Sequence, residues 1–418
     1  MATKDVLAKV NAVQVPQGRK VALAYSGGLD SSLAIELLRR KYKAAAIFPI
    51  TIDVGQGEEE IAEGRMKAKK LGVEQIEIDA RKEFTEEWLP KAIRANSDYN
   101  GYPVSTSMTR QLVARLVALK GRELGANALM EGSTGKGNDQ YRMHNCFKMF
   151  APEMEIFAPV RDFDFTRAEE KELCQEWGVP VTEQITGGDD KTMWCRSIAS
   201  GAVDLNQEIA DDVWLWLKPP QMAADKPTVI EIEFEKGVPV KLDGKRAGLE
   251  KIISALNVIG GANGIGKIDM FEDGIMDLKS REIYEAPGAH IIIKLHRDLE
   301  QACLTKDEIQ FKKVVDAKWA FLVYHGMWYH PLKEALDAFI AATQPVVNGK
   351  YRVSLYKGNI EIIYRESETS LFTPEIRSIK AGGFNQKAAK DAALIRGLPF
   401  EILSKRTAKM AKKSKQDD

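Results

Sequence analysis

The first candidate site is a short string of glycine, serine and aspartate near the amino terminus. Residues 26–32 read SGGLDSS and follow an apolar run at 21–25. Two adjacent glycines let the backbone approach a ligand closely and adopt φ values that other residues avoid. A helical pattern of apolar residues leads out of the string, so free N–H groups at a new helix start would join the serine hydroxyls. Such a place suits a phosphate group, because a helix start carries partial positive charge.

A second polar string has the residue types of an amino-acid site. Residues 132–142 read GSTGKGNDQYR and follow an apolar run at 126–131. Asn138 can both donate and accept hydrogen bonds, and Asp139 can orient a substrate ammonium. Arg142 can grip a carboxylate with two parallel hydrogen bonds. The plain alternatives are a polar surface loop here and an ordinary serine-capped turn at the first string.

Alternating strands and helices would bring the two strings together. We expect strands at 21–25, 44–52, 73–78, 126–131 and 157–160, and helices at 33–40, 58–71, 82–95, 106–125 and 166–177. This alternation predicts an α/β fold with a parallel sheet covered on both faces. Ligands bind at the carboxyl ends of such strands. The turns at Ser26, Asp53 and Gly132 should therefore share one edge, which a chance surface loop does not explain.

The pattern changes after about residue 182 and predicts an α+β region. Strands are expected at 230–234, 238–242, 291–295, 351–355 and 360–364, with helices at 249–260 and 331–343. We therefore divide the chain into domains at 1–182 and 183–384 and a helical tail at 385–418. The tail is basic over 405–415 but ends in two aspartates. That ending favours a solvated or subunit-contacting tail over nucleic-acid binding.

Composition limits the class of protein. The chain has 418 residues, 44% of them hydrophobic, with 60 basic and 60 acidic side chains, so it offers no electrostatic argument for nucleic acid. Four cysteines stand far apart without a Cys-x-x-Cys pair, which fits a reducing compartment. No apolar run approaches the roughly 20 residues that span a bilayer. We expect a cytoplasmic protein with no membrane or nucleic-acid partner.

The first string resembles the pyrophosphate-binding loop of the N-type ATP pyrophosphatases, and the motifs together resemble the argininosuccinate synthase family. That family's loop reads AYSGGLDTS, and only Ser31 differs here. Its TGKGNDQ string is intact at 134–140, and its Tyr…GTSLAR segment is matched by YPVSTSMTR at 102–110. Its KSRG(I/V)YETP string is matched by KSREIYEAP at 279–287. The resemblance runs in register from about residue 21 to about residue 370.

The resemblance implies an adenine nucleotide α-hydrolase-like domain, an α+β synthetase domain and a C-terminal helical tail. It implies a C–N ligase that condenses L-citrulline with L-aspartate, at the expense of ATP with Mg²⁺, in arginine biosynthesis. It also implies a homotetramer, without a tightly bound cofactor or a metal held by the protein alone.

The resemblance also implies residue roles. Those for ATP are Ala24, Tyr25, Ser26, Gly27, Gly28, Leu29, Asp30, Ser31, Ser32, Ile52 and Gly132. Those for aspartate are Thr106, Thr134, Asn138 and Asp139. Those for citrulline are Tyr102, Ser107, Asn138, Arg142, Ser197, Glu272 and Tyr284. Asp30, Ser26 and Asp139 would act most directly in catalysis, and no general base is implied.

Departures from the family pattern gather on the citrulline side. A serine and a glutamate of the family fall at Gly188 and Ala199, and a common histidine falls at Glu131. Trp214 and Trp216 stand in an unusual linker. These changes leave open a ligase of the same chemistry with another ureido or amide acceptor. A second alternative is a tRNA-modifying pyrophosphatase, but the paired cysteines or basic domain usual in such enzymes are not found in this sequence. A third is a catalytically silent nucleotide-binding regulator, which would not need Asp30, Asp139 and Arg142.

Overall fold

The computed structural model describes residues 2–182, 190–200, 205–377, 380 and 382–414. The chain forms two compact units, Met1–Ser370 and Leu371–Asp418. Within the described residues, no helix combines the length and apolar character needed to cross a membrane. The domain division at residues 182 and 384 stays a prediction.

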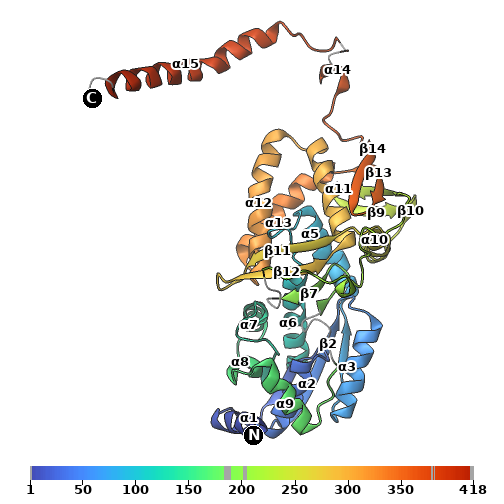
Figure 1. Cartoon of the computed structure of the whole chain (residues 1–418), viewed down its shortest axis with the longest axis vertical. Helices are drawn as coiled ribbons and strands as arrows, with labels where there is room; N and C mark the ends of the chain where they lie inside the picture. Colours follow the sequence, from blue (N-terminus) through green and yellow to red (C-terminus); the bar gives the residue numbers. More distant parts are fainter. Residues whose placement is uncertain (1, 183–189, 201–204, 378–379, 381, 415–418) are drawn as a thin grey trace. The chain divides into compact units, whose positions relative to one another are not determined.

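A parallel five-stranded sheet forms the amino-terminal part of the larger unit (Figure 1). Its order is β3 (Ile76–Asp79), β2 (Ala46–Asp53), β1 (Lys20–Ala24), β4 (Ala128–Met130) and β5 (Glu155–Phe157). All four pairings are parallel. The α/β class expected from the sequence is confirmed, and the ends of β1, β2 and β4 lie at one edge.

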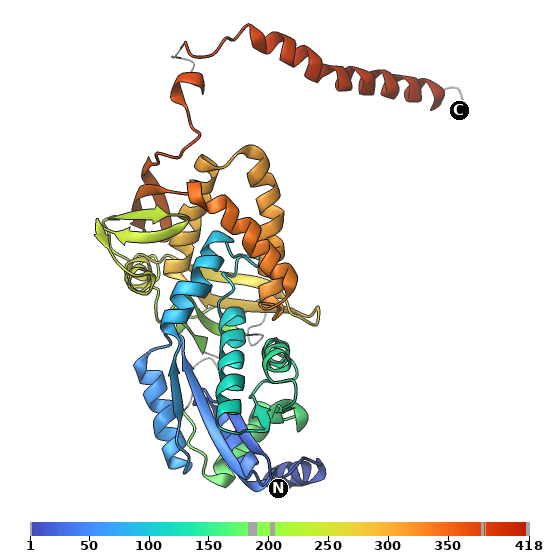
Figure 2. The same ribbon diagram turned by 180° about the vertical axis from the view of Figure 1, so that it is seen from behind.

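Helices cover both faces of this sheet, because successive side chains of a strand point to opposite faces. On one face, Ala22 and Leu129 share a core with α6 (Ser105–Glu123), which lies along the strands in Figure 2. On the other face, Val21 and Leu23 share a core with α1, α2, α3 and α9. These helices span Ala2–Ala12, Leu29–Arg40, Glu58–Lys70 and Arg167–Trp177.

The strand expected at 157–160 is wrong beyond Phe157. Strand β5 ends there, and helix α8 (Pro159–Asp162) begins. Proline has no N–H for the sheet but fits the first turn of a helix. The helix expected at 82–95 consists of α4 (Arg81–Glu83), the π-helical turn η1 (Phe84–Trp88) and α5 (Leu89–Arg94).

The rest of the larger unit contains two further sheets. One has the order β10–β9–β8–β13–β14 and the other β11–β12–β7–β6, and every pairing in them is antiparallel. The bounds are β6 (Asp190–Lys191), β7 (Arg196–Ser200), β8 (Thr228–Glu235), β9 (Val238–Leu242), β10 (Lys245–Arg246), β11 (Lys267–Asp273), β12 (Lys279–Glu285), β13 (Gly349–Tyr356) and β14 (Asn359–Glu366). The strands expected at 230–234, 238–242, 351–355 and 360–364 are confirmed.

The strand expected at 291–295 is wrong, because these residues lie inside α11 (Pro287–Cys303). A short apolar run does not distinguish a strand from a buried helix. The buried positions of α11 continue through His296, Leu299 and Cys303, a helical spacing. The other helices here are α10 (Leu249–Ala262), α12 (Lys306–Tyr324) and α13 (Pro331–Thr343), with short turns η2 (Asp211–Val213) and η3 (Gln344–Val346).

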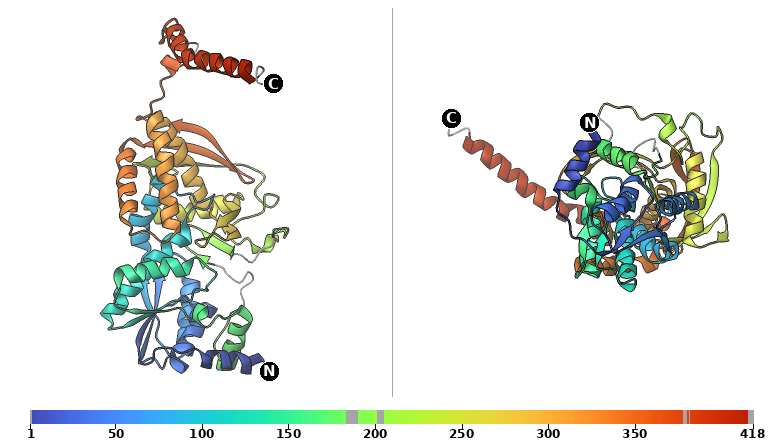
Figure 3. Two further views of the ribbon diagram at one scale, coloured as in Figure 1. Left: turned by 90° about the vertical axis from the view of Figure 1, so that its left-hand side faces the viewer. Right: turned by 90° about the horizontal axis from the view of Figure 1, so that it is seen from below.

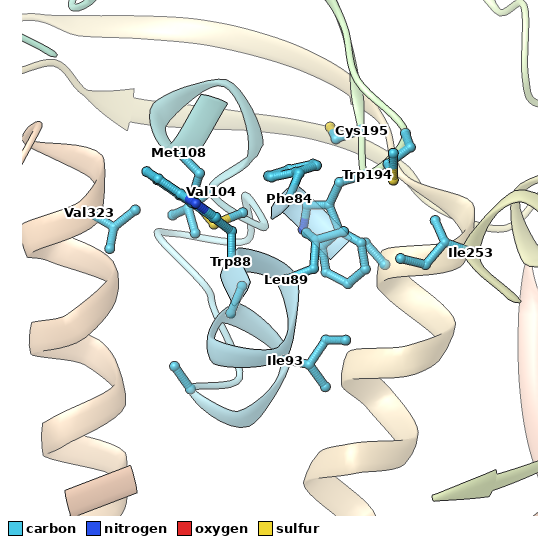
Figure 4. Close-up of a cluster of buried hydrophobic side chains, with 14 of the residues drawn as sticks. Phe84, Trp88, Leu89, Ile93, Val104, Met108, Trp194, Cys195, Ile253 and Val323 are labelled. Carbon is cyan, nitrogen blue, oxygen red and sulfur yellow. The ribbon is translucent and has the colours of Figure 1, made fainter. Parts of the chain in front are cut away.

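One hydrophobic core joins the parallel sheet to this second part. Figure 4 shows Trp88 of η1 and Met108 of α6 among side chains from α5, α10 and α12. Trp194 is fully buried in the same cluster and donates from Nε1 to the carbonyl of Pro103 at 2.9 Å. The sheet edge and the second part are therefore held together by packed side chains.

The smaller unit contains a short helix, α14 (Pro374–Arg377), and a long one, α15 (Ala388–Ser414) (Figure 3). The helical tail expected from the sequence is confirmed. Apolar side chains of α15, among them Leu394, Leu398 and Phe400, are exposed in the single chain.

Candidate active site at the carboxyl ends of the parallel strands

The first string forms a tight turn between β1 and α2. Gly27 has φ +74°, in the left-handed region that favours glycine. Gly28 is the extended residue that precedes the helix, so the first amides of α2 have no intrahelical partner. The hydroxyls of Ser26 and Ser31 lie 3.2 Å apart, and the Ser26 oxygen accepts from the Gly28 amide at 3.3 Å. The turn therefore gathers N–H and O–H groups at a helix start, as an anion site needs.

Helix α3 supports this turn from one side. A Cβ on Gly27 would lie 2.6 Å from the Cα of Gly64, so the two backbones are in direct contact. Tyr25 donates from its hydroxyl to the carbonyl of Gly64 at 3.1 Å. The buried Lys67 donates to the carbonyl of Gly27 at 2.9 Å. Lys67 could not be singled out from the sequence, because it continues the charged pattern of an exposed helix face.

Asp30 lies where the two strings meet. It forms an ion pair with Arg167 of α9. A Cβ on Gly132 would lie 3.2 Å from the Cβ of Asp30, so the start of the second string contacts the start of α2. Burial raises the pKa of Asp30, and Arg167 opposes that effect. Strands β2 and β4 both pair parallel with β1, so the expectation that the turns at Ser26, Asp53 and Gly132 would share one edge is confirmed.

The other residues assigned to ATP surround the turn. Ala24 ends β1, Ser32 lies fully buried in α2, and Ile52 is buried near the end of β2. Tyr25 accepts at its carbonyl from Thr51 at 2.7 Å, which ties the turn to β2. Their part in binding ATP stays a prediction.

The second string is a folded loop followed by a helix, α7 (Asp139–Phe150). Thr134 accepts at Oγ1 from the Gly137 amide at 3.2 Å. Gln140 donates to the carbonyls of Gly135 and Gly137 at 2.9 and 3.1 Å. Asp139 is the first residue of α7 and Arg142 follows three positions later, so their side chains lie on the same face of the helix.

Asp139 lies between two arginines. Arg110 of α6 donates to it at 2.7 Å and Arg142 at 2.9 Å. Burial alone would raise the pKa of Asp139, but the two guanidinium groups outweigh it and hold that pKa below its usual range. Arg110 also pairs with Asp190 of β6 at 2.7 Å. The Asp139 carboxylate is therefore ionised at neutral pH, as a partner for an ammonium must be.

Glu272 is the centre of a second polar cluster. Its carboxylate accepts from the hydroxyls of Tyr284 and Tyr324. Asn138 donates to the Tyr324 hydroxyl at 2.9 Å, and Arg142 donates from Nε to the Tyr324 carbonyl at 2.9 Å. Burial raises the pKa of Glu272, and the tyrosine hydrogen bonds oppose the rise. Tyr324 thus joins the second string to Glu272.

The start of α6 faces the same cluster. Tyr102 stacks on Tyr284 with ring centroids 4.4 Å apart, and its hydroxyl accepts from the Thr106 amide at 2.6 Å. Ser107 is fully buried, and its hydroxyl has no hydrogen-bond partner among the described residues. Ser197 pairs in register with Tyr284 in the neighbouring strand. The residues assigned to citrulline and aspartate therefore lie close together.

The departures from the family pattern have separate places. Gly188 lies outside the described residues, and Ala199 stands in β7 opposite Ile283. Glu131 is buried, and its carboxylate accepts from the Ser133 amide at 2.6 Å. Burial raises the pKa of Glu131, and its hydrogen bonds to Ser133 oppose the rise.

The unusual linker is anchored to the sheet. Trp214 packs with Ile198 and Ile283. The amide of Trp216 donates to Glu285 at 2.8 Å. The linker therefore covers β7 and β12 rather than the polar cluster.

Sequence reasoning assigned no role to Arg110, Arg167 or Tyr324. Arg110 lay within the 102–110 match and could have been found there. Arg167 and Tyr324 carry no local signal, since only the packing of α9 and α12 brings them to the site. Among the described residues, no three His, Cys, Asp or Glu side chains come together as a metal site would need. A surface hollow lined by Glu86, Arg94 and Glu235, among others, contains none of the predicted residues.

Comparison with known proteins agrees with this arrangement. Residues 20–180 match the family model of the arginosuccinate synthase N-terminal HUP domain, and residues 188–403 match that of the arginosuccinate synthase C-terminal domain. The chain is 42% identical over 391 residues to the argininosuccinate synthase of Methanopyrus kandleri, covering 93% of this chain and 99% of that protein. It is 41% identical over 397 residues to that of Methanococcus maripaludis, covering 94% and 100%. It is 40% identical over 388 residues to that of Rubrobacter xylanophilus, covering 91% and 94%. The resemblance drawn from the motifs is confirmed, and the chain belongs to the argininosuccinate synthase family.

Proposed function

We propose that this protein condenses L-citrulline with L-aspartate at the expense of ATP and releases argininosuccinate, AMP and pyrophosphate. The observation that carries the proposal is the contact between Asp30 and Gly132. It joins the turn at residues 26–32, here called the phosphate-type turn because it could bind a phosphate, to the string that contains Asp139 and Arg142. A nucleotide site beside an amino-acid site is what adenylation requires.

In the first step, the ureido oxygen of citrulline attacks the α-phosphorus of ATP. The bond from the α-phosphorus to the bridging oxygen breaks, and pyrophosphate leaves with the electron pair. The amides and hydroxyls of residues 26–32 would stabilise the departing charge, since they gather donors at a helix start. ATP enters with Mg²⁺, which neutralises phosphate charge, and Asp30 is the carboxylate of the turn that would orient this complex.

In the second step, the amine of aspartate attacks the activated ureido carbon. The bond from this carbon to the AMP oxygen breaks, AMP leaves with the electron pair, and the proton of the attacking amine passes to the leaving phosphate or to water. Asp139 would orient the aspartate ammonium, and Arg142 would hold the citrulline carboxylate. Glu272, fixed by Tyr284 and Tyr324, would bind the citrulline ammonium. Most of the rate would come from proximity and from leaving-group stabilisation, so no side chain need be a strong base.

The test is pyrophosphate release from ATP and Mg²⁺ by the purified chain, with aspartate present and citrulline present or absent. We expect release that depends on citrulline, with argininosuccinate as the product. Release with another ureido or amide acceptor and none with citrulline would favour the alternative ligase. The names of the relatives do not favour that alternative. No release with any acceptor would overturn the proposal.

We also propose a cytoplasmic homotetramer. The exposed apolar side chains of α15 support an assembly role for the smaller unit. Light scattering on the full chain, and on a chain ending at Ser370, tests this. We expect a tetramer for the first and a smaller species for the second, and a full chain that is monomeric would contradict it.

A further inference from the structure

Arg167 lies against the phosphate-type turn but belongs to neither polar string. It stands on the first turn of α9 and pairs with Asp30, the second residue of α2. Its Nη1 also lies 2.9 Å from Oε2 of Glu170, one turn further along α9. Two carboxyl groups thus hold one guanidinium beside the turn.

The charges at this place need a cation when a phosphate enters. Asp30 lies at the start of α2, where an anion would bind, and the side chain of Glu170 is only 2% exposed. The Asp30 carboxylate would repel a pyrophosphate group brought next to it. Arg167 supplies the opposite charge on the same side of the turn, whereas Lys67 donates to the Gly27 carbonyl from α3.

The Arg167 guanidinium is able to take a further partner besides Asp30 and Glu170. Both ion pairs to described residues use Nη1, so the N–H groups on Nε and Nη2 remain for an oxyanion. The Arg167 side chain is 46% exposed, so it is accessible from solvent. Glu170 has a second oxygen, Oε1, that is buried without a hydrogen-bond partner among the described residues. Glu170 can therefore hold the guanidinium of Arg167 at Nη1 while Nε and Nη2 of that guanidinium face a ligand.

We propose that Arg167 binds the two outer phosphates of ATP, which leave as pyrophosphate, and that Glu170 positions it. This inference rests on the proposed function and adds one residue to it. In the resting protein Arg167 neutralises Asp30. When ATP enters with Mg²⁺, Asp30 turns to that complex, and Arg167 donates to oxygens of the departing group. Arginine suits this task because its planar fork matches a phosphate.

The test is calorimetric binding of Mg²⁺–pyrophosphate and of AMP to the full chain. Replacing Arg167 by methionine should weaken pyrophosphate binding about 10- to 100-fold, the range for a hydrogen bond between charged groups. AMP lacks the outer phosphates, so its affinity should change less than about twofold. The pyrophosphate affinity of Arg167→Lys should lie between those of the unsubstituted chain and of Arg167→Met, because lysine keeps the charge but lacks the planar guanidinium.

Arg40 offers a matched control. It also links α2 to α9, since it pairs with Glu36 and lies over the ring of Trp177, but it stands at the far end of α2. Arg40→Met should leave pyrophosphate binding unchanged. Equal losses in Arg40→Met and Arg167→Met, or equal losses for AMP and pyrophosphate, would assign Arg167 to helix docking and overturn the proposal.

Unchanged pyrophosphate binding in Arg167→Met would also overturn it. If that variant does not fold, Arg167→Lys gives the same comparison, and equal binding to the unsubstituted chain then contradicts the inference. The unsubstituted chain's citrulline-dependent pyrophosphate release tests the proposed function separately, so the two can fail independently.

Discussion

A Cβ on Gly27 would lie 2.6 Å from the Cα of Gly64. The turn that follows β1 therefore has its shape set partly by α3, some 40 residues later in the chain. Gly27 also has φ +74°. Both a short contact and a left-handed backbone require glycine at this position.

Gly27→Ala should abolish ATP binding. The new methyl group would force the turn away from α3, and the left-handed backbone would itself cost about 1–2 kcal/mol. Calorimetric titration with ATP measures the loss. Far-ultraviolet circular dichroism should remain that of a folded chain, because the turn is a small part of the core.

Gly72→Ala is the control for backbone strain alone. Gly72 has φ +71°, but the nearest atom to its added Cβ is Nη2 of Arg39 at 3.8 Å. Gly72→Ala should lower the free energy of unfolding by about 1–2 kcal/mol and leave ATP binding intact. ATP binding by Gly27→Ala at the unsubstituted level would remove the turn from the site.

Asp139→Asn should separate the two half-reactions. The substitution keeps the size of the side chain but removes the charge between Arg110 and Arg142. Citrulline-dependent pyrophosphate release should persist, while argininosuccinate formation should fall about 100-fold, since the aspartate ammonium loses its ionic partner. Product analysis by mass spectrometry measures both. Loss of both half-reactions together would show instead that Asp139 mainly holds Arg142 in place.

Tyr324→Phe should weaken citrulline binding. The Tyr324 hydroxyl donates to Glu272 and accepts from Asn138, so its removal takes one hydrogen bond from each. Glu272 keeps the hydrogen bond from the Tyr284 hydroxyl. We expect the KM for citrulline to rise about tenfold or more, the effect of one hydrogen bond to a charged group. Steady-state kinetics at fixed ATP and aspartate measure it.

Tyr329→Phe is the matched control. The Tyr329 hydroxyl is buried and has no hydrogen-bond partner among the described residues. Removing it should leave the KM for citrulline unchanged and cost little or no stability. Equal effects of the two substitutions on KM would show that Tyr324 has no special link to the site.

Much of the sheet edge could be predicted from local patterns. Apolar runs followed by glycine-rich strings predicted that Ser26 and Gly132 lie at one edge of the sheet. The structure adds that their strands are neighbours and that Gly132 contacts Asp30. The roles of Arg167 and Tyr324 could not be predicted, because each reaches the site only when a distant helix packs. The strand expected at 291–295 failed for a related reason. Its apolar run fits either element, and only burial of one face of α11 decides between them.

Lys333 should make the free energy of unfolding rise with pH in the alkaline range. It is buried on α13, lies 3.3 Å from the ring centroid of Trp328, and pairs with Asp337 at 2.8 Å. Burial lowers the pKa of Lys333 from 10.5 to about 8, although Asp337 opposes the shift. Between these two values the unfolded chain binds the proton and the folded chain does not, so stability contributed by this site rises with pH.

Replacing Lys333 by methionine removes that rise. Between pH 8 and pH 10.5, the free energy of unfolding measured in urea should rise for the unsubstituted chain, relative to Lys333→Met, by up to about 3 kcal/mol. Lys350→Met is the control, because the Lys350 side chain is only half-buried and Glu366 raises its pKa. Its difference from the unsubstituted chain should stay constant over the same range. Parallel pH profiles for the unsubstituted chain and Lys333→Met would mean that Lys333 keeps its proton in the folded state, held by Asp337 and the Trp328 ring.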